Sequence, residues 1–241
     1  MARLKFDISS LADQRDPRAL ATYTIGDAAR YLRIPVSTVR AWLHGTSYGV
    51  RQDKHTFQRV IEPPDATRAL LSFYNLAEAH VLRALRQDHN IPLWHVRHAL
   101  DYVKEQFGWQ RPLVEQQFQT DGVSLFIERL GKLVDVSAQG QIVMRQVVEA
   151  HLERLEWEDQ LVARLYPFTR SRDADSPKLV IIDPRYSFGR PVLKDAGVAT
   201  AVIAERYKAG DSIRQLARDY GCTPLEIEEG LRCELSVATA A

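Results

Sequence analysis

The sequence predicts a mainly α-helical protein with small β elements, an α+β chain. Two observations support this class: apolar residues recur at helical spacing through most of the chain, and short β-rich runs interrupt them. In addition, pairs of short helices separated by helix breakers occur near both ends. With 241 residues, of which 45% are hydrophobic and 26% charged, the chain can build a buried core and one to two domains.

The first pair of helices has clear start and stop signals. Thr24 and Asp27 have the spacing of a helix capping box, and Pro35 ends that helix. Ser37 is expected to cap a second short helix, which ends at Gly45. Two short helices joined by a tight turn predict a helix-turn-helix.

A β-hairpin is expected directly after this motif. Residues 47–50 (SYGV) and 57–62 (FQRVIE) are β-rich, and two prolines end the second run. A strand pair in this place predicts the wing of a winged helix-turn-helix. Residues 71–73 are a candidate for one more short strand, and amphipathic helices are expected at 76–88 and 92–107.

The central part predicts a β-meander followed by a long helix. The runs at 124–128, 132–136 and 141–144 are rich in β-forming residues and are separated by glycines. A helix is expected over residues 147–165, with an apolar stripe on one side and an acidic face opposite. This amphipathic helix makes the segment a candidate for dimerisation.

A polar, charged stretch at residues 171–177 is the best candidate for a linker. After it, a strand at 178–182 and a turn-rich loop at 183–191 precede three helices. Gly210 and Gly221 end the first two of these helices. The last two helices predict a second, carboxy-terminal helix-turn-helix.

The predicted organisation has four segments. They are an N-terminal arm at 1–20, a winged helix-turn-helix DNA-binding domain with a helical extension at 21–108, a central meander and long helix at 109–172, and a helix-turn-helix domain at 173–241.

The net charge of +1 is unevenly distributed. Residues 1–60 carry ten Lys and Arg against five Asp and Glu, whereas the rest of the chain is slightly acidic. A basic amino-terminal part predicts an anionic partner, so we expect the first motif to bind operator DNA rather than serve as scaffold alone. The residues expected to contact DNA are Ser37, Thr38, Arg40 and His44 on the second helix and Arg51, Lys54, His55 and Arg59 on the wing.

The second helix-turn-helix has the opposite charge. Its last helix carries several carboxylates against one cation: Glu226, Glu228, Glu229 and Glu234 against Arg232. Phosphates would be repelled by this helix. We therefore expect the second motif to bind a protein or to dimerise. DNA contact stays the alternative, through a basic edge formed by Arg206, Lys208, Arg214 and Arg218.

Other classes of protein find little support. His95 and His98 have metal-compatible spacing but no evident third ligand, and no nucleophile elbow, phosphate loop or HExxH motif is present. We therefore expect no catalytic residue, no metal, no cofactor and no enzymatic activity. Two cysteines cannot form a disulfide framework, and no apolar run reaches the length of about 20 residues that spans a membrane. The chain is expected to be cytoplasmic, with no membrane partner.

Two sets of residues resemble known families. Residues 23–32 (YTIGDAARYL) and 37–42 (STVRAW) resemble the MerR-type winged helix-turn-helix, whose second helix enters the major groove. A second set is similar to a small bacterial domain found in antitoxins: residues 182–184 (IDP), 188–192 (FGRPV), 209–213 (AGDSI), 216–217 (LA) and 220–221 (YG). The combination resembles VapB-type antitoxins with an amino-terminal winged helix.

The resemblance implies a non-catalytic antitoxin of a type II toxin–antitoxin pair, which neutralises a PIN-like ribonuclease toxin and represses its own operon. Such nucleases gather carboxylates around a metal, so Arg185, Tyr186 and Arg190 in the turn-rich loop are the expected toxin-binding residues. A homodimer is expected, because one helix-turn-helix seldom binds specifically alone. The alternative is a free-standing MerR-like transcription regulator without a toxin partner.

Overall fold

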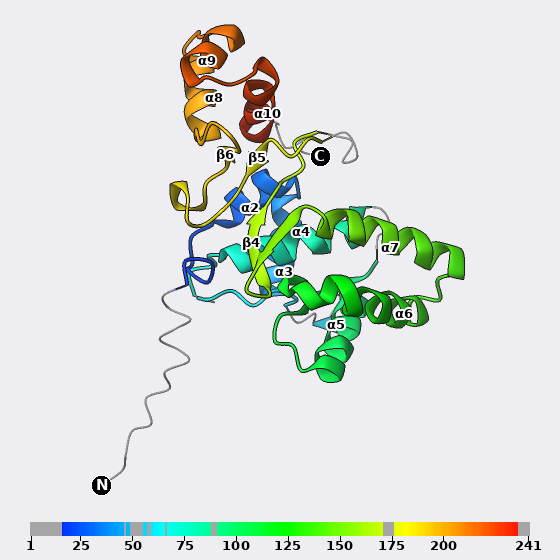
Figure 1. The fold of residues 1–241 in the computed structure, drawn as a ribbon. Coiled ribbons are helices and arrows are strands. Elements are labelled where there is room, and N and C mark those ends of the chain that lie inside the picture. The colour runs from blue at the N-terminus through cyan, green and yellow to red at the C-terminus, as the bar shows by residue number, and fades with distance from the viewer. Residues whose placement is uncertain are drawn as a thin grey trace.

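The computed structural model describes residues 16–45, 47–48, 55–56, 59–65, 67–87, 91–170 and 176–235 (Figure 1). Its helices are α2 (Ile25–Leu32), α3 (Val36–His44), α4 (Phe73–Gln87), α5 (Leu93–Phe107), α6 (Val123–Leu133), α7 (Ala138–Leu152), α8 (Thr200–Lys208), α9 (Ile213–Tyr220) and α10 (Pro224–Leu235). Its strands are β1 (Ser47–Tyr48), β2 (His55–Thr56), β3 (Leu155–Glu158), β4 (Leu161–Leu165), β5 (Val180–Ile181) and β6 (Val192–Leu193). The strands form antiparallel pairs, β1 with β2, β3 with β4 and β5 with β6. The expected class, mainly α with small β elements, is confirmed.

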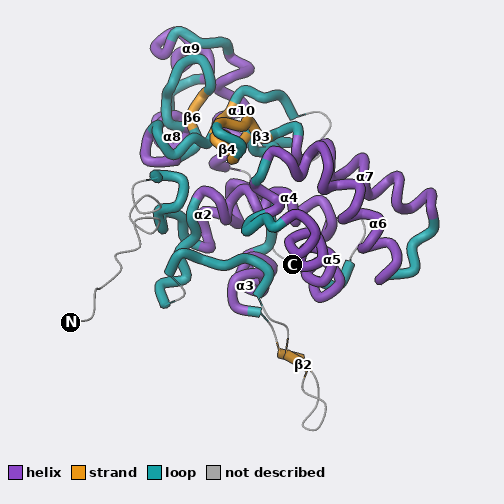
Figure 2. The backbone as a smooth tube through the Cα atoms, turned by 60° about the horizontal axis from the view of Figure 1, so that its bottom comes forward, coloured by secondary structure: helices purple, strands orange, loops and turns teal. Residues whose placement is uncertain are grey.

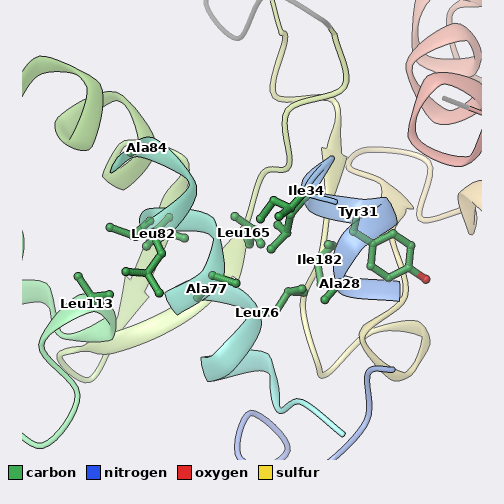
Figure 3. Packing of buried hydrophobic residues seen from close by; sticks show 14 of the residues in the cluster. Ala28, Tyr31, Ile34, Leu76, Ala77, Leu82, Ala84, Leu113, Leu165 and Ile182 are labelled. Atoms are coloured by element: carbon green, nitrogen blue, oxygen red, sulfur yellow. The ribbon is translucent and has the colours of Figure 1, made fainter. Parts of the chain in front are cut away.

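One main core joins elements from all parts of the described chain. Helices α8 to α10 lie at one end of the molecule and α5 to α7 at the other, with α2, α4 and β4 between them (Figure 1). Figure 3 shows Tyr31 of α2, Leu76 of α4, Leu165 of β4 and Ile182 among the buried residues that meet in the middle. Burial of these side chains therefore holds the first helix-turn-helix against the later segments.

The first helix-turn-helix forms as expected, with one difference at its second helix. The Asp27 backbone N–H donates to Thr24 Oγ1 at 3.0 Å and the Thr24 N–H donates to Asp27 Oδ2 at 3.0 Å, which confirms the capping box. Gly45 ends α3 with φ of 72°. Ser37 is not the cap, because α3 begins one residue before it, after Pro35. The fixed φ of a proline suits the start of a helix.

The hairpin after α3 is present, but its second strand lies earlier than expected. β1 pairs with β2, which precedes the strand predicted at 57–62. Residues 59–62, the described end of that run, form no strand. Instead the N–H groups of Val60 and Ile61 donate to Trp42 O at 2.9 and 3.1 Å, which ties the chain to the end of α3.

Residues 71–73 do not form the candidate strand. Leu71 makes a single antiparallel bridge with Tyr23, and α4 begins two residues later. α4 and α5 confirm that two helices follow.

The central β-meander is wrong: α6 occupies the run predicted at 124–128 and the start of the run at 132–136, α7 occupies the run at 141–144, and residues 134–137 between the helices form no strand. The large buried side chains of α6 have helical spacing, at Val123, Phe126, Ile127 and Leu130. Gly131 acts as a packing residue and not as a turn: a Cβ there would lie 2.5 Å from the Gln141 side chain of α7. A small residue at this place lets the two helices approach closely.

The long helix expected over residues 147–165 is wrong in its second half. α7 covers only the first part, and the β3–β4 hairpin follows. Asp159 and Gln160 reverse the chain with φ of 52° and 66°. A turn with two left-handed residues usually contains a glycine, and this one has none, so the sequence carries no clear hairpin signal. Arg164 donates to Glu156 Oε2 at 3.0 Å across the two strands. Glu156, which was expected on the acidic face of the long helix, therefore forms a cross-strand pair with Arg164.

The carboxy-terminal helices are confirmed. Of the strand expected at 178–182, β5 forms the central part, whereas residues 171–175 of the linker candidate lie outside the described residues. Ser212 caps α9 by accepting from the Gln215 N–H at 3.2 Å, and Gly221 ends α9 with φ of 64°. In the described ranges no helix has the length and apolar character needed to cross a membrane.

Two buried histidines join α4 to α7. His80 is 1% exposed, its ring centroid lies 5.0 Å from that of His151, and its Nε2–H donates to His151 O at 3.1 Å. Burial lowers the pKa of His80 well below its ordinary value, and the nearby His151 and Arg83 lower it further. The folded protein therefore holds His80 neutral.

We expect acid to destabilise the protein through His80. The unfolded chain protonates this residue near pH 6.5 and the folded chain does so only at lower pH, so stability is complete above pH 6.5 and is lost as the pH falls below it. The slope contributed by this group is about 1.4 kcal/mol for each pH unit. The free energy of unfolding, measured with urea at several pH values between 7.5 and 5, should fall less steeply with decreasing pH for His80→Gln than for the exposed-site control His98→Gln. Equal slopes for the two variants would contradict this role.

Candidate functional site

The second helix of the first motif presents a polar face. Val39, Trp42 and Leu43 of α3 are buried, which leaves Ser37, Arg40 and His44 exposed and Thr38 partly exposed. Ser37, Arg40 and His44 share one side of the helix, because residues three, four and seven apart face the same way. Within the described part of the chain Arg40 makes no ion pair. A guanidinium, an imidazole and a hydroxyl on one exposed helix face suit phosphates and base edges.

Strand β2 of the wing lies beyond α3, away from the helical part of the molecule (Figure 2). His55 is in β2, and Arg59 is exposed shortly after this strand. The carbonyl oxygen of Arg59 accepts from the Arg97 guanidinium of α5, so the base of the wing is attached to the helical extension. Arg51 and Lys54, the other two expected wing contacts, lie outside the described residues.

Glu226 and Glu229 of α10 are buried and the Glu234 side chain is only 5% exposed, whereas the Glu228 side chain is 41% exposed. Glu229 of α10 is fully buried and forms ion pairs with Arg170 and Arg232, at 2.7 Å each. Burial works to raise the pKa of Glu229, but hydrogen bonds from Thr169 and Arg170 outweigh it and leave the pKa below its ordinary value. The charge on α10 thus has an internal structural use.

The end of α10 is docked on the first helix-turn-helix. Glu234 of α10 forms an ion pair with Arg30 of α2, and its carboxylate also accepts from Thr200 of α8. Arg33, just after α2, donates to Thr169 O at 2.7 Å. The two helix-turn-helix motifs are therefore in direct contact through α2.

A buried carboxylate shapes the loop between β5 and β6. Asp183 is fully buried, and it accepts from the Arg164 guanidinium at 2.9 Å and from Arg185 Nε and Nη2 at 3.0 and 2.9 Å. Burial works to raise the pKa of Asp183, but the hydrogen bonds from Arg185 and Arg164 outweigh it, so the pKa is below its ordinary value. Arg185 also pairs with Glu158 at 2.6 Å. The start of the loop is thus fixed to the β3–β4 hairpin.

The tip of the same loop has an unusual backbone. Ser187, Phe188 and Gly189 have φ of 50°, 56° and 74°, three consecutive left-handed residues of which only the last is a glycine. The Tyr23 hydroxyl donates to Gly189 O at 3.0 Å and holds the tip against the residue that precedes the α2 cap. The side chain at the turn, Phe188, is 87% exposed.

A hollow of about 380 Å³ opens beside this tip, between α2, the loop and the start of α8. Its lining combines charged, aromatic and small residues: Thr22, Tyr23, Asp27, Arg30, Tyr31, Phe188, Arg190 and Ala201.

The structure places the three expected toxin-binding residues differently. Arg190 is exposed and lines the hollow, and Tyr186, four residues earlier, is 54% exposed. The Arg185 guanidinium forms ion pairs with Glu158 and Asp183 of the same chain. Phe188 is a candidate that sequence reasoning missed, and an aromatic residue inside the turn-rich run DPRYSFGRP is the signal that points to it.

Comparisons with known proteins agree with these two regions. Residues 21–100 match a family described as "Putative DNA-binding HTH domain", and residues 180–232 match a family described as "Protein of unknown function (DUF433)". A curated relative, "Putative antitoxin VapB45" of Mycobacterium tuberculosis (strain ATCC 25618 / H37Rv), is 29% identical over 225 residues, which cover 87% of this chain and 92% of the relative. The X-ray crystal structure of Rv2018 from Mycobacterium tuberculosis is similar with a TM-score of 0.64 and 26% identity, over 88% of this chain and 98% of that one. The MerR-like character of the wing stays a prediction.

Gly189 is expected to be needed for the loop. A Cβ at this position would lie 2.1 Å from the Tyr23 hydroxyl, and the backbone has positive φ, whereas Gly197 has a similar φ of 66° and open space around it. Gly189→Ala should therefore lower the free energy of unfolding by roughly 1–3 kcal/mol more than Gly197→Ala. Addition of Tyr23→Phe should recover part of the loss, because it removes the closest atom. Thermal and urea unfolding measure these differences, and equal losses in the two glycine variants would contradict the close approach.

Proposed function

We propose that this chain is the antitoxin of a type II toxin–antitoxin pair, which binds operator DNA through its first helix-turn-helix. The observation that carries the DNA part is the exposed polar face of α3, with Ser37, Arg40 and His44 free of buried contacts, in the region that matches a helix-turn-helix family. The basic charge of residues 1–60 supports it, because phosphate contacts supply much of the affinity for DNA.

The antitoxin part is supported by the relative named as a VapB45 antitoxin, whose similarity spans nearly the whole of both chains. In this proposal the partner is a PIN-like ribonuclease and the carboxy-terminal loop, with Tyr186 and Arg190, contacts it. The complex or the free chain represses the operon that encodes both proteins.

We also propose that the chain acts as a homodimer and that the central segment, residues 109–172, supplies the contact. Helix α7 exposes Ile142 and Val143, at 49% and 41%. α6 and α7 extend to one side of the molecule, where a second copy has access to them (Figure 1). Two copies would present two α3 helices to inverted half-sites.

The alternative function is a free-standing transcription regulator without a toxin partner. It is favoured by the folded state of residues 176–235, which pack on α2 and do not form an extended tail. The four-segment division of the chain is compatible with either function.

Substitutions on α3 and on the wing should affect DNA binding differently. Arg40→Ala should reduce the preference at one operator position by roughly 1–3 kcal/mol, because a guanidinium that pairs with guanine reads the base. Lys54→Ala should weaken all sequences alike and reduce the salt slope by about one unit, as expected for a phosphate contact. Titrations of the promoter duplex and a scrambled duplex at several salt concentrations measure both effects.

The matched control is Arg214→Ala, which removes an exposed arginine from α9 of the second motif. It should leave affinity for the promoter duplex unchanged. Loss of binding in Arg214→Ala, with Arg40→Ala unaffected, would show that the wrong motif has been assigned to DNA.

The antitoxin function is tested by co-expression of the full chain with the protein encoded by the adjacent gene. We expect the two to co-purify as a stable complex, and we expect the ribonuclease activity of the partner to be suppressed in that complex. An adjacent gene product that neither binds the chain nor cleaves RNA would contradict the antitoxin function and favour the free-standing regulator.

A further inference from the structure

Phe188 is exposed far more than the other large hydrophobic side chains in the described part of the chain. Its exposed fraction is 87%, against 54% for Tyr186, the next most exposed. An isolated exposed apolar residue is ordinary on a protein surface. Phe188 differs because it stands on a strained backbone, and strained backbone persists only where the surrounding contacts impose it.

The contacts that impose this conformation come from both sides of the loop. Asp183 and Arg185 fix its beginning, where the Arg185 N–H and the guanidinium both donate to Asp183 Oδ1, at 2.9 and 3.0 Å. Within the turn the Gly189 N–H donates to Tyr186 O at 2.9 Å, and the Tyr23 hydroxyl holds Gly189 O. The backbone that carries Phe188 is therefore held in one conformation before any partner binds, which reduces the entropy lost on binding.

The hollow next to Phe188 has an unmatched positive charge. Of its two arginines, Arg30 already pairs with Asp27 at 3.3 Å and with Glu234. Arg190 has no carboxylate partner among the described residues. A ligand group with negative charge would complete this lining.

The geometry points to a docking site for an acidic segment of a partner protein: a carboxylate of that segment enters the hollow to pair with Arg190, and a neighbouring apolar side chain packs on Phe188. Aromatic residues and arginines that stand on rigid supports are the side chains that dominate protein interfaces. Arg185 is a positioning residue in this site, because it acts through Asp183 and Glu158 and not on the partner. The inference deepens the proposed function, since the partner it describes is the toxin.

The test uses the full chain and the adjacent gene product, with Kd measured by isothermal titration calorimetry. Phe188→Ala and Arg190→Ala should each weaken the complex by about tenfold or more. The matched controls are Tyr207→Ala, which removes a 42% exposed aromatic ring from α8, and Arg214→Ala; both should bind like the wild type. Thermal unfolding confirms that each variant is folded, which is expected because the Phe188 side chain lies almost wholly in solvent.

The outcomes separate this inference from the proposed function. If the wild type binds the adjacent gene product and the Phe188 and Arg190 variants bind it equally well, the docking site is wrong and the antitoxin function stands. If the wild type does not bind it, the antitoxin function fails. The docking site is then tested separately, by measuring whether the chain binds a fluorescein-labelled decapeptide of alternating Glu and Leu. Binding of that peptide, lost in Arg190→Ala and absent for the Lys and Leu counterpart, would support the site; no binding would overturn it.

Discussion

The buried carboxylate of Asp183 is the interaction on which the arrangement of this protein depends. Burial of an ion disfavours its charged form, and the carboxylate remains ionised because Arg164 and Arg185 both donate to it. Arg164 belongs to β4, and next to it Leu165 exchanges two backbone hydrogen bonds with Ile182, at 3.0 and 2.9 Å. Together these contacts attach the carboxy-terminal helices to the centre of the molecule and fix the loop that carries Phe188.

Helix α2 is the element that brings the two candidate surfaces close together. It packs on α3, whose exposed face is proposed to contact DNA, and it supplies Asp27, Arg30 and Tyr31 to the hollow proposed to receive a partner protein. The pairs that join α2 to α10 and Tyr23 to Gly189 make this a firm attachment. Two acidic residues of α10 have a structural explanation: Glu234 pairs with Arg30 of α2, and Glu229 pairs with Arg170, which follows β4.

Local signals account for the parts of the fold that the sequence predicts well. Thr24 with Asp27 begins α2 and Gly45 ends α3, and each depends on groups within four residues. The central segment is mispredicted because its β-forming residues and glycines outweighed the helical spacing of Val123, Phe126 and Leu130, and because the contact of Gly131 with α7 is visible only in the structure.

The site follows the same rule. The exposed residues of α3 follow from helical spacing alone. From the sequence, Arg185 cannot be told from an unpaired arginine, because its partners Asp183 and Glu158 are brought to it by the fold. The loop that carries Phe188 is likewise held by Tyr23, whose hydroxyl bonds Gly189 O across 166 positions of sequence.

The most direct test of this account is hydrogen–deuterium exchange of the full chain with and without a duplex from its own promoter. The account predicts slower exchange in α3 and the wing, with no change in α9 and α10. Slower exchange in α9 and α10, with none in α3, would contradict it.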